Sequence, residues 1–227
     1  MEMEKGIQIA IDGPAAAGKS TIAKITASKL GYAYIDTGAM YRALTYKALK
    51  EHIDVYDDDA LSSLLEQIVI DLVPTEEGQI VRLDGEDVTE VIRSQEVTSN
   101  VSATAAQPRV REMMVEKQRL LANTKGVVMD GRDIGTAVLP NAELKIFMTA
   151  SVKERAARRF VENTKRGIDR SMEELCQDIS NRDKADTERI ASPLKQASDA
   201  IFIDTTSMSI EQVADTIIHH VEKRKRP

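Results

Sequence analysis

Short apolar runs alternate with longer amphipathic segments over most of this 227-residue chain. Five runs are short and almost wholly apolar, which predicts buried parallel strands; they span 6–13, 32–37, 127–131, 144–150 and 200–206. The intervening segments repeat apolar residues at helical spacing, as Ile22, Ile25 and Leu30 do before Gly31. Strands separated by helices predict an α/β fold, with a five-stranded parallel sheet covered on both faces.

The pattern changes between residues 68 and 93. Apolar and polar residues alternate there, and the alternation is broken by TEEG and DGED. Such breaks are typical of hairpin turns, so a small antiparallel sheet is predicted as an insertion in the α/β chain. Helices return afterwards, and Ser151 with Glu154 and Ser171 with Glu174 match the capping box that opens a helix.

Composition narrows the class of protein. The chain is 42% hydrophobic and 30% charged, as expected of a globular domain with one core, and no apolar run is long enough to cross a membrane. A net charge of −6, aromatics at 4% and the absence of Trp argue against nucleic-acid binding. The start MEMEKG lacks the apolar region of a secretory signal, and the single cysteine, Cys176, forms no internal disulfide. We expect a cytoplasmic monomer.

The stretch GPAAAGKST carries the clearest chemical signal. Gly13, Gly18, Lys19 and Ser20 match G-x-x-x-x-G-K-[ST], between a predicted strand and a predicted helix. Small side chains let backbone N–H groups surround a phosphate, with Lys19 toward the β- and γ-phosphates and Ser20 on Mg²⁺. The alternative is a tight turn with an exposed lysine. The predicted ATP-binding residues of this loop are Gly13, Pro14, Ala15, Ala16, Ala17, Gly18, Lys19, Ser20 and Thr21.

The segments after or before other strands are rich in arginine. We find no N-K-x-D base reader of a GTPase, so a kinase of a small acceptor is the leading class. Arginine binds phosphate through two parallel hydrogen bonds, which favours an acceptor that already carries a phosphate, such as a nucleoside monophosphate. Each arginine alone has a plainer interpretation as a surface charge. The four in or near expected loops are Arg42, Arg132, Arg182 and Arg189.

A basic helix is predicted at 151–167. Its cations include Arg155, Arg158 and Arg159. A functional interpretation is a lid that closes on the ATP triphosphate, neutralises charge in the transition state and excludes water. The alternative is a solvated basic helix face.

Five segments occur in register along the chain: IDGPAAAGKST, YIDTGAMYRA, QEVTSNVSATAAQPRVRE, DGRDIGT and NRDKADTERIASPL. Together they closely resemble the bacterial cytidylate kinases, from about Gly6 to the last helix. The resemblance implies a three-layer P-loop kinase with a core at 1–39, 107–150 and 171–227, an acceptor-binding insertion at 40–106 and a lid at 151–170. It implies transfer of a phosphoryl group from ATP to CMP or dCMP, with Mg²⁺.

The resemblance also implies roles for single residues. Ser102, Arg111 and Asp133 resemble the cytosine readers. Arg42, Arg132 and Arg189 resemble the residues that bind the acceptor phosphate. Asp186 resembles the residue that binds the sugar hydroxyls, and Arg182 is expected to contact the phosphates. Asp130 is expected to hold a water on Mg²⁺, and Asp36 to orient an arginine or meet the sugar. The catalytic set is Lys19, Arg132, Arg182 and Arg189.

Two alternatives remain open at this stage. One is a P-loop kinase of another small acceptor, such as UMP, AMP or a compound that is not a nucleotide. The other is a nucleotide-binding regulatory module without turnover, although such a module has no need of Lys19, Ser20 and the arginines together.

Overall fold

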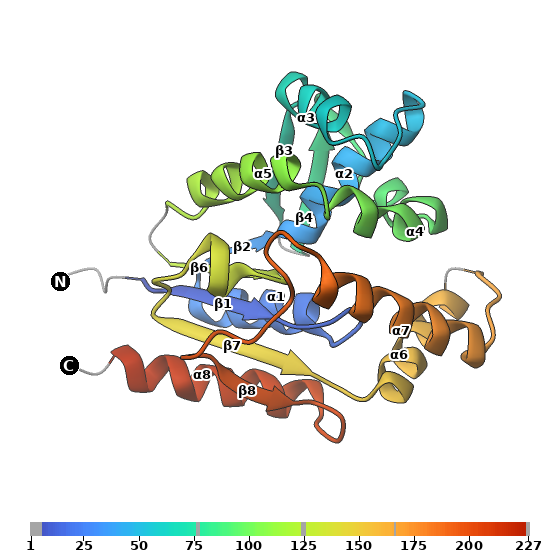
Figure 1. Cartoon of the computed structure of the whole chain (residues 1–227). Coiled ribbons are helices and arrows are strands. Elements are labelled where there is room, and N and C mark those ends of the chain that lie inside the picture. Colours follow the sequence, from blue (N-terminus) through green and yellow to red (C-terminus); the bar gives the residue numbers. More distant parts are fainter. Residues whose placement is uncertain (1–5, 76–77, 124–125, 166, 226–227) are drawn as a thin grey trace.

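The computed structural model describes residues 6–75, 78–123, 126–165 and 167–225. The five predicted strands are present as β1 (Gln8–Asp12), β2 (Ala33–Asp36), β6 (Val127–Gly131), β7 (Leu144–Thr149) and β8 (Ile201–Asp204). They form one parallel sheet in the order β2-β6-β1-β7-β8 (Figure 1). The predicted α/β class and strand number are therefore confirmed.

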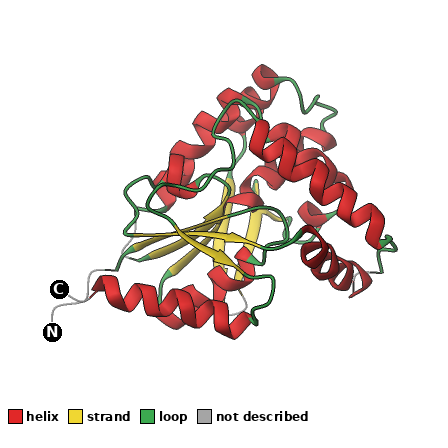
Figure 2. Ribbon diagram, turned by 60° about the horizontal axis from the view of Figure 1, so that its bottom comes forward, coloured by secondary structure: helices red, strands yellow, loops and turns green. Residues whose placement is uncertain are grey.

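Helices cover both faces of this sheet, as its apolar strands require (Figure 2). Ile9 and Ile11 of β1 pack in the cluster formed with α1 (Lys19–Leu30) and α8 (Ile210–Lys225). Ala10, between them, packs on the opposite face in the cluster that includes α5 (Pro108–Leu121). Within the described part of the chain, no helix is both long enough and apolar enough to span a membrane.

The insertion after β2 packs around a separate hydrophobic cluster, to which α5 also contributes. It contains α2 (Thr37–Lys50), α3 (Asp58–Gln67), η1 (Val91–Arg93), α4 (Gln95–Thr104) and a three-stranded antiparallel sheet of β3 (Ile70–Thr75), β4 (Gly78–Leu83) and β5 (Glu86–Asp87). Leu44, Leu61 and Ile92 are fully buried there. The predicted small sheet is confirmed, although residues 76–77 of its first turn lie outside the described residues, as do residues 1–5 at the amino terminus.

One side chain attaches the small sheet to the edge of the large one. Gln79 Nε2 donates to the carbonyl of Tyr34 at 2.8 Å, and the Asp36 N–H donates to Gln79 Oε1 at 3.3 Å. The side-chain amide thereby forms hydrogen bonds with backbone groups at the free edge of β2, as a neighbouring strand would. This contact lies where the chain enters the insertion, because Asp36 caps α2 by accepting the Ala39 N–H.

The last third of the chain adds α6 (Val152–Lys165) and α7 (Met172–Glu188), which lie side by side (Figure 1). The capping box of Ser171 and Glu174 is present in full. At the start of α6, Ser151 Oγ accepts the Glu154 N–H at 3.2 Å. One prediction was wrong: Arg182 lies on α7 and not in or near a loop, because the helix started by the capping box continues to Glu188.

Candidate active site

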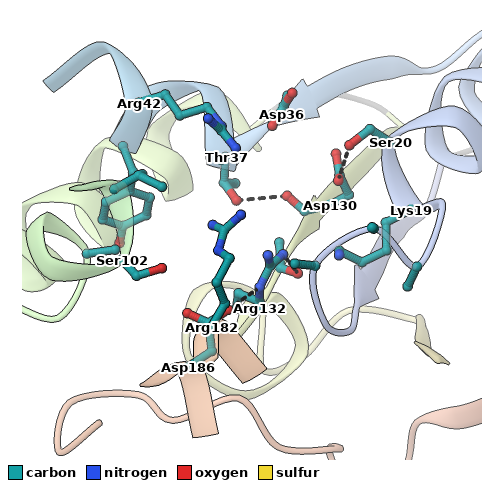
Figure 3. A pocket seen from close by; sticks show the side chains of 18 of the residues that line it. Lys19, Ser20, Asp36, Thr37, Arg42, Ser102, Asp130, Arg132, Arg182 and Asp186 are labelled. Carbon is teal, nitrogen blue, oxygen red and sulfur yellow. Dashed lines mark hydrogen bonds and ion pairs between the residues drawn. The ribbon is translucent and has the colours of Figure 1, made fainter. Parts of the chain in front are cut away.

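A cavity of about 330 Å³ opens at the carboxyl ends of the parallel strands, between the insertion and the core. In Figure 3, Lys19 and Ser20 lie on one side of it, Ser102 on the other, and Arg132 and Arg182 between them. Most predicted site residues line it: Ala15, Ala16, Ala17, Gly18, Lys19, Ser20, Thr21, Asp36, Arg42, Ser102, Arg111, Asp130, Arg132, Asp133, Arg159, Arg182, Asp186 and Arg189.

The loop between β1 and α1 needs its two glycines for different reasons. A Cβ on Gly13 would lie 1.9 Å from the Met148 carbonyl oxygen, so a side chain is sterically excluded there. Gly18 caps α1 with φ of 90°, a left-handed conformation that glycine adopts without strain. The loop therefore ends at the N-terminus of α1, where unpaired N–H groups and the helix dipole favour an anion.

Lys19 is folded back into this loop. Its ammonium donates to the carbonyl of Pro14 at 2.8 Å, and the residue is 6% exposed. Burial, together with the nearby charge of Arg132, lowers the pKa of Lys19 to about 7. A bound polyphosphate would supply the negative charge that this ammonium lacks.

Ser20 and Asp130 form the cation-binding candidate. Ser20 Oγ donates to Asp130 Oδ2 at 2.8 Å, and Tyr34 donates its hydroxyl to Asp130 Oδ1 at 2.9 Å. Burial is the main reason that the pKa of Asp130 is raised to about 6, and neighbouring Asp36 raises it further. Among the described residues no group of three or more His, Cys, Asp or Glu is placed to hold a metal. The hydroxyl and the carboxylate suit Mg²⁺, which keeps several waters and takes other ligands from phosphate.

At the opposite end, Arg111 and Asp133 form a buried ion pair. Arg111 Nη2 lies 2.5 Å from Asp133 Oδ2, Nη1 donates to the Ala105 carbonyl at 2.8 Å, and the guanidinium lies 5.5 Å from the ring centroid of Tyr41. Arg111 Nε and the Oγ of Ser102, which lines the same cavity, are buried and find no hydrogen-bond partner in the described part of the chain. Unsatisfied buried groups are rare, and here they belong to residues that line the cavity.

Between the two ends lies a cluster of arginines. Arg132 Nε donates to Asp186 Oδ2 at 2.8 Å, whereas Arg182 Nε and Arg189 Nη2 are buried without a hydrogen-bond partner among the described residues. Burial, with repulsion from neighbouring arginines, lowers the pKa of Arg42 to about 9 and that of Arg182 to about 10. These groups remain charged at neutral pH, so the cavity concentrates positive charge as an anion site does.

Two further residues were missed by sequence reasoning. Arg93, on η1, lines the cavity and lies 3.4 Å from Asp36 Oδ2, so an arginine-orienting contact of Asp36 is observed. Asp12 is buried below the loop, accepts the N–H groups of Ile134 and Gly135 at 2.8 and 2.7 Å, and thereby fixes the turn that follows Asp133. No sequence pattern marks Arg93. Asp12 could have been identified from the sequence, because it is a charged residue at the end of a buried strand.

The three arginines predicted in the lid separate into two groups. Arg159 lines the cavity and pairs with Glu162 at 3.4 Å. Arg155 and Arg158 do not line the cavity and instead donate to carbonyl oxygens of the phosphate loop, those of Ala15 and Ala17. Gly13 and Pro14 belong to the loop but do not line the cavity.

Comparison with known proteins gives the family. The family model described as cytidylate kinase matches residues 9–223. The chain is 57% identical to the cytidylate kinase of Bacillus subtilis (strain 168) over 224 residues, which cover 99% of this chain and all of that one. It is 60% identical to that of Geobacillus sp. (strain WCH70) over 222 residues, covering 98% and 99% of the two chains.

A likeness to a solved structure supports the fold alone. An uncharacterized protein from Eubacterium ventriosum ATCC 27560 superposes with a TM-score of 0.51 at 14% identity, over 95% of this chain and 98% of that one. The sequence relatives match over almost their whole length, and the cavity carries the phosphate loop and arginines that the sequence predicted. The chain belongs to the cytidylate kinase family.

Proposed function

We infer that this chain transfers the γ-phosphoryl group of ATP to CMP, giving ADP and CDP. The observation that carries the inference is the buried pair of Arg111 and Asp133, which lines the same cavity as the phosphate loop. The hydroxyl of Ser102 lines this cavity too and has no hydrogen-bond partner among the described residues. Membership of the cytidylate kinase family supports the inference.

The donor binds at the loop between β1 and α1. Backbone N–H groups surround the β-phosphate, and Lys19 exchanges its contact with the Pro14 carbonyl for the β- and γ-phosphate oxygens. Phosphoryl transfer spreads negative charge over these oxygens, so a preorganised ammonium acts more strongly on the transition state than on the bound substrate.

The acceptor base is read by hydrogen-bond pattern. Cytosine presents an amino donor at position 4 beside the N3 and O2 acceptors. A carboxylate or hydroxyl receives the amino group, and a guanidinium supplies the acceptors. Uracil presents an acceptor at position 4, so Asp133 would face a second oxygen. Because both members of the pair are buried, each mismatched group is left unpaired and away from water.

The arginines serve the transfer itself. The attacking oxygen belongs to the CMP phosphate and is already ionised, so no general base is needed. This oxygen forms a bond to the γ-phosphorus while the bond from that phosphorus to the β–γ bridging oxygen breaks and ADP leaves. Arg132, Arg182 and Arg189 hold the two polyanions together despite their repulsion, which lowers the barrier by positioning and by charge neutralisation.

Two finer features are part of the proposal. Mg²⁺ would be held by Ser20 directly and by Asp130 through water, where it neutralises phosphate charge. Deoxycytidylate would serve as a second acceptor, since the base and phosphate contacts do not involve the 2′-hydroxyl. Asp186, which is proposed to accept from the sugar, already accepts from Arg132.

A steady-state coupled assay with ATP and four acceptors tests the function. CMP and dCMP should be phosphorylated at far higher kcat/KM than UMP or AMP, and removal of Mg²⁺ should abolish turnover. Equal rates with UMP or AMP would replace the proposal by that of a broader kinase. Tight nucleotide binding without turnover for any acceptor would favour a regulatory module.

A further inference from the structure

Helix α6 contributes a buried arginine whose donors are turned away from the cavity. Arg155 is 4% exposed. Its Nε donates to the Ala150 carbonyl at 2.8 Å and its Nη1 to the Ala15 carbonyl at 3.2 Å. Both terminal nitrogens donate to the carboxylate of Asp183, at 3.0 and 2.6 Å. One planar guanidinium thus contacts three parts of the chain: the residue after β7, the phosphate loop and α7.

Two of these partners belong to segments that line the cavity. Ala15 belongs to the loop that surrounds the donor phosphates. Asp183 is adjacent in sequence to Arg182 on α7, and Asp186 is one turn further along; both of those residues line the cavity. The contact through Arg155 therefore joins the donor loop to the helix that carries acceptor-side groups.

We propose that Arg155 is a positioning residue that fixes α7 relative to the phosphate loop and so sets the alignment of donor and acceptor phosphates. The two hydrogen bonds to Asp183 define an orientation that a single contact from lysine cannot reproduce. Alignment of reacting groups contributes strongly to rate, and small displacements lower it markedly. This inference rests on the proposed function, because it requires both nucleotides in one cavity.

Arg158 provides a matched control one turn along the same helix. Its Nη1 donates to the Ala17 carbonyl at 3.2 Å and to Thr205 Oγ1 at 3.1 Å, and its Nη2 donates to the Thr205 carbonyl at 2.8 Å. Its Nε donates to Glu154 on α6 itself. Arg158 therefore links the phosphate loop to the residue after β8, whereas Arg155 links the loop to α7.

The test compares the affinity for a ligand that joins both nucleotides with the affinities for the two separate nucleotides. Calorimetry measures the binding of a nonhydrolysable ATP analogue, of CMP, and of adenosine and cytidine joined by five phosphates. The linked ligand benefits from its connection only when both half-sites have the correct separation. In Arg155→Lys and in Asp183→Asn, its affinity should fall about tenfold further than the product of the losses for the separate nucleotides. In Arg158→Lys, it should fall only as much as that of the ATP analogue.

The double variant of Arg155→Lys with Asp183→Asn should be no worse than the poorer single variant, since both changes break the same contact. The proposal would be overturned if the affinity for the linked ligand fell only by the product of the two fold-losses measured for the ATP analogue and for CMP. Asp183→Asn keeps side-chain size at a partly exposed position, so it breaks the same ion pair without changing the buried arginine. A wild-type protein that binds no CMP would refute the proposed function instead.

Discussion

Two arginines of the cavity use their donors differently from two arginines at the start of α6. Arg182 and Arg189 keep buried nitrogens without a hydrogen-bond partner among the described residues, beside space that a ligand can enter. Arg155 and Arg158 direct theirs to carbonyl oxygens and to Asp183. A given donor of an arginine is available to a substrate only where the fold leaves that donor unused; within the cavity, Arg111 and Arg132 already donate in part to Asp133 and Asp186. Spacing in the sequence cannot show which donors remain.

Electrostatics distinguish Arg42 and Arg182 from Arg155 as well, although Arg132 within the cavity is paired with Asp186. The cavity arginines lie close enough to repel one another, which is part of the reason that the pKa of Arg42 and of Arg182 is lowered. Arg155 is matched by a carboxylate instead. A cluster of imperfectly compensated positive charge binds a polyanion well, because the protein has already been organised around that charge before binding.

The largest effect should come from the cation at the donor end. Lys19→Ala should lower kcat by about 100- to 1,000-fold, as loss of a preorganised transition-state donor does. CMP affinity should change little, because Lys19 contacts the phosphate loop and not the acceptor end. Steady-state kinetics at saturating ATP and CMP titration check both statements. Near wild-type turnover would contradict the assignment of the loop.

Removal of cavity arginines should give the next largest effect. Arg132→Ala and Arg189→Ala should each lower kcat/KM for CMP by roughly 10- to 150-fold, which corresponds to about 1.5–3 kcal/mol for a charged hydrogen bond. The affinity for ATP alone should stay close to that of the wild type. If titrations showed lost ATP affinity and intact CMP affinity, the donor and acceptor ends would have to be exchanged.

A smaller effect is expected at Ser102. The hydroxyl has no hydrogen-bond partner among the described residues, so Ser102→Ala should leave the melting temperature unchanged. Affinity for CMP should fall by only a few fold, since one neutral hydrogen bond contributes about 0.5–1.5 kcal/mol. Unchanged CMP affinity in calorimetry would remove Ser102 from the base-reading group.

The smallest expected effect is the uptake of protons when ATP binds. The pKa of Lys19 is lowered to about 7 in the free protein, so at pH 8 the amine is mostly neutral. Phosphate oxygens of ATP should raise this pKa, and binding at pH 8 should take up at most about one proton. Below pH 6 the amine is already protonated and uptake through Lys19 should vanish. Calorimetry in buffers of different ionisation enthalpy measures the uptake, which Lys19→Met should remove.

Much of the architecture was predictable from local pattern. Buried parallel strands read as continuous apolar runs, and hairpins as alternation broken by glycine, so the five strands and the small sheet followed directly. The phosphate loop was equally clear, because Gly13 and Gly18 occupy conformations or spaces closed to other residues. The family resemblance supplied Ser102 and Arg111, which their helical positions alone do not mark.

What the sequence could not predict depends on tertiary contacts. Arg182 was expected in or near a loop, since charged residues dominate its segment and hide the helical period. Arg155, Arg158 and Arg159 are near neighbours on one helix, yet the packing of α6 against the loop sends them to different surroundings. Arg93 reaches the cavity only because the insertion and the phosphate loop line it together.

The central claim is that Asp133, held by Arg111, selects cytosine. The most direct test is kcat/KM for CMP and for UMP in the wild type and in Asp133→Ala, with Asp133→Asn as a control that keeps side-chain volume. Loss of the contact to the amino group should lower CMP turnover by about 1–3 kcal/mol in kcat/KM and UMP turnover little, so the wild-type preference for CMP should shrink. Equal proportional losses for the two acceptors would contradict the account and leave Asp133 a structural partner of Arg111.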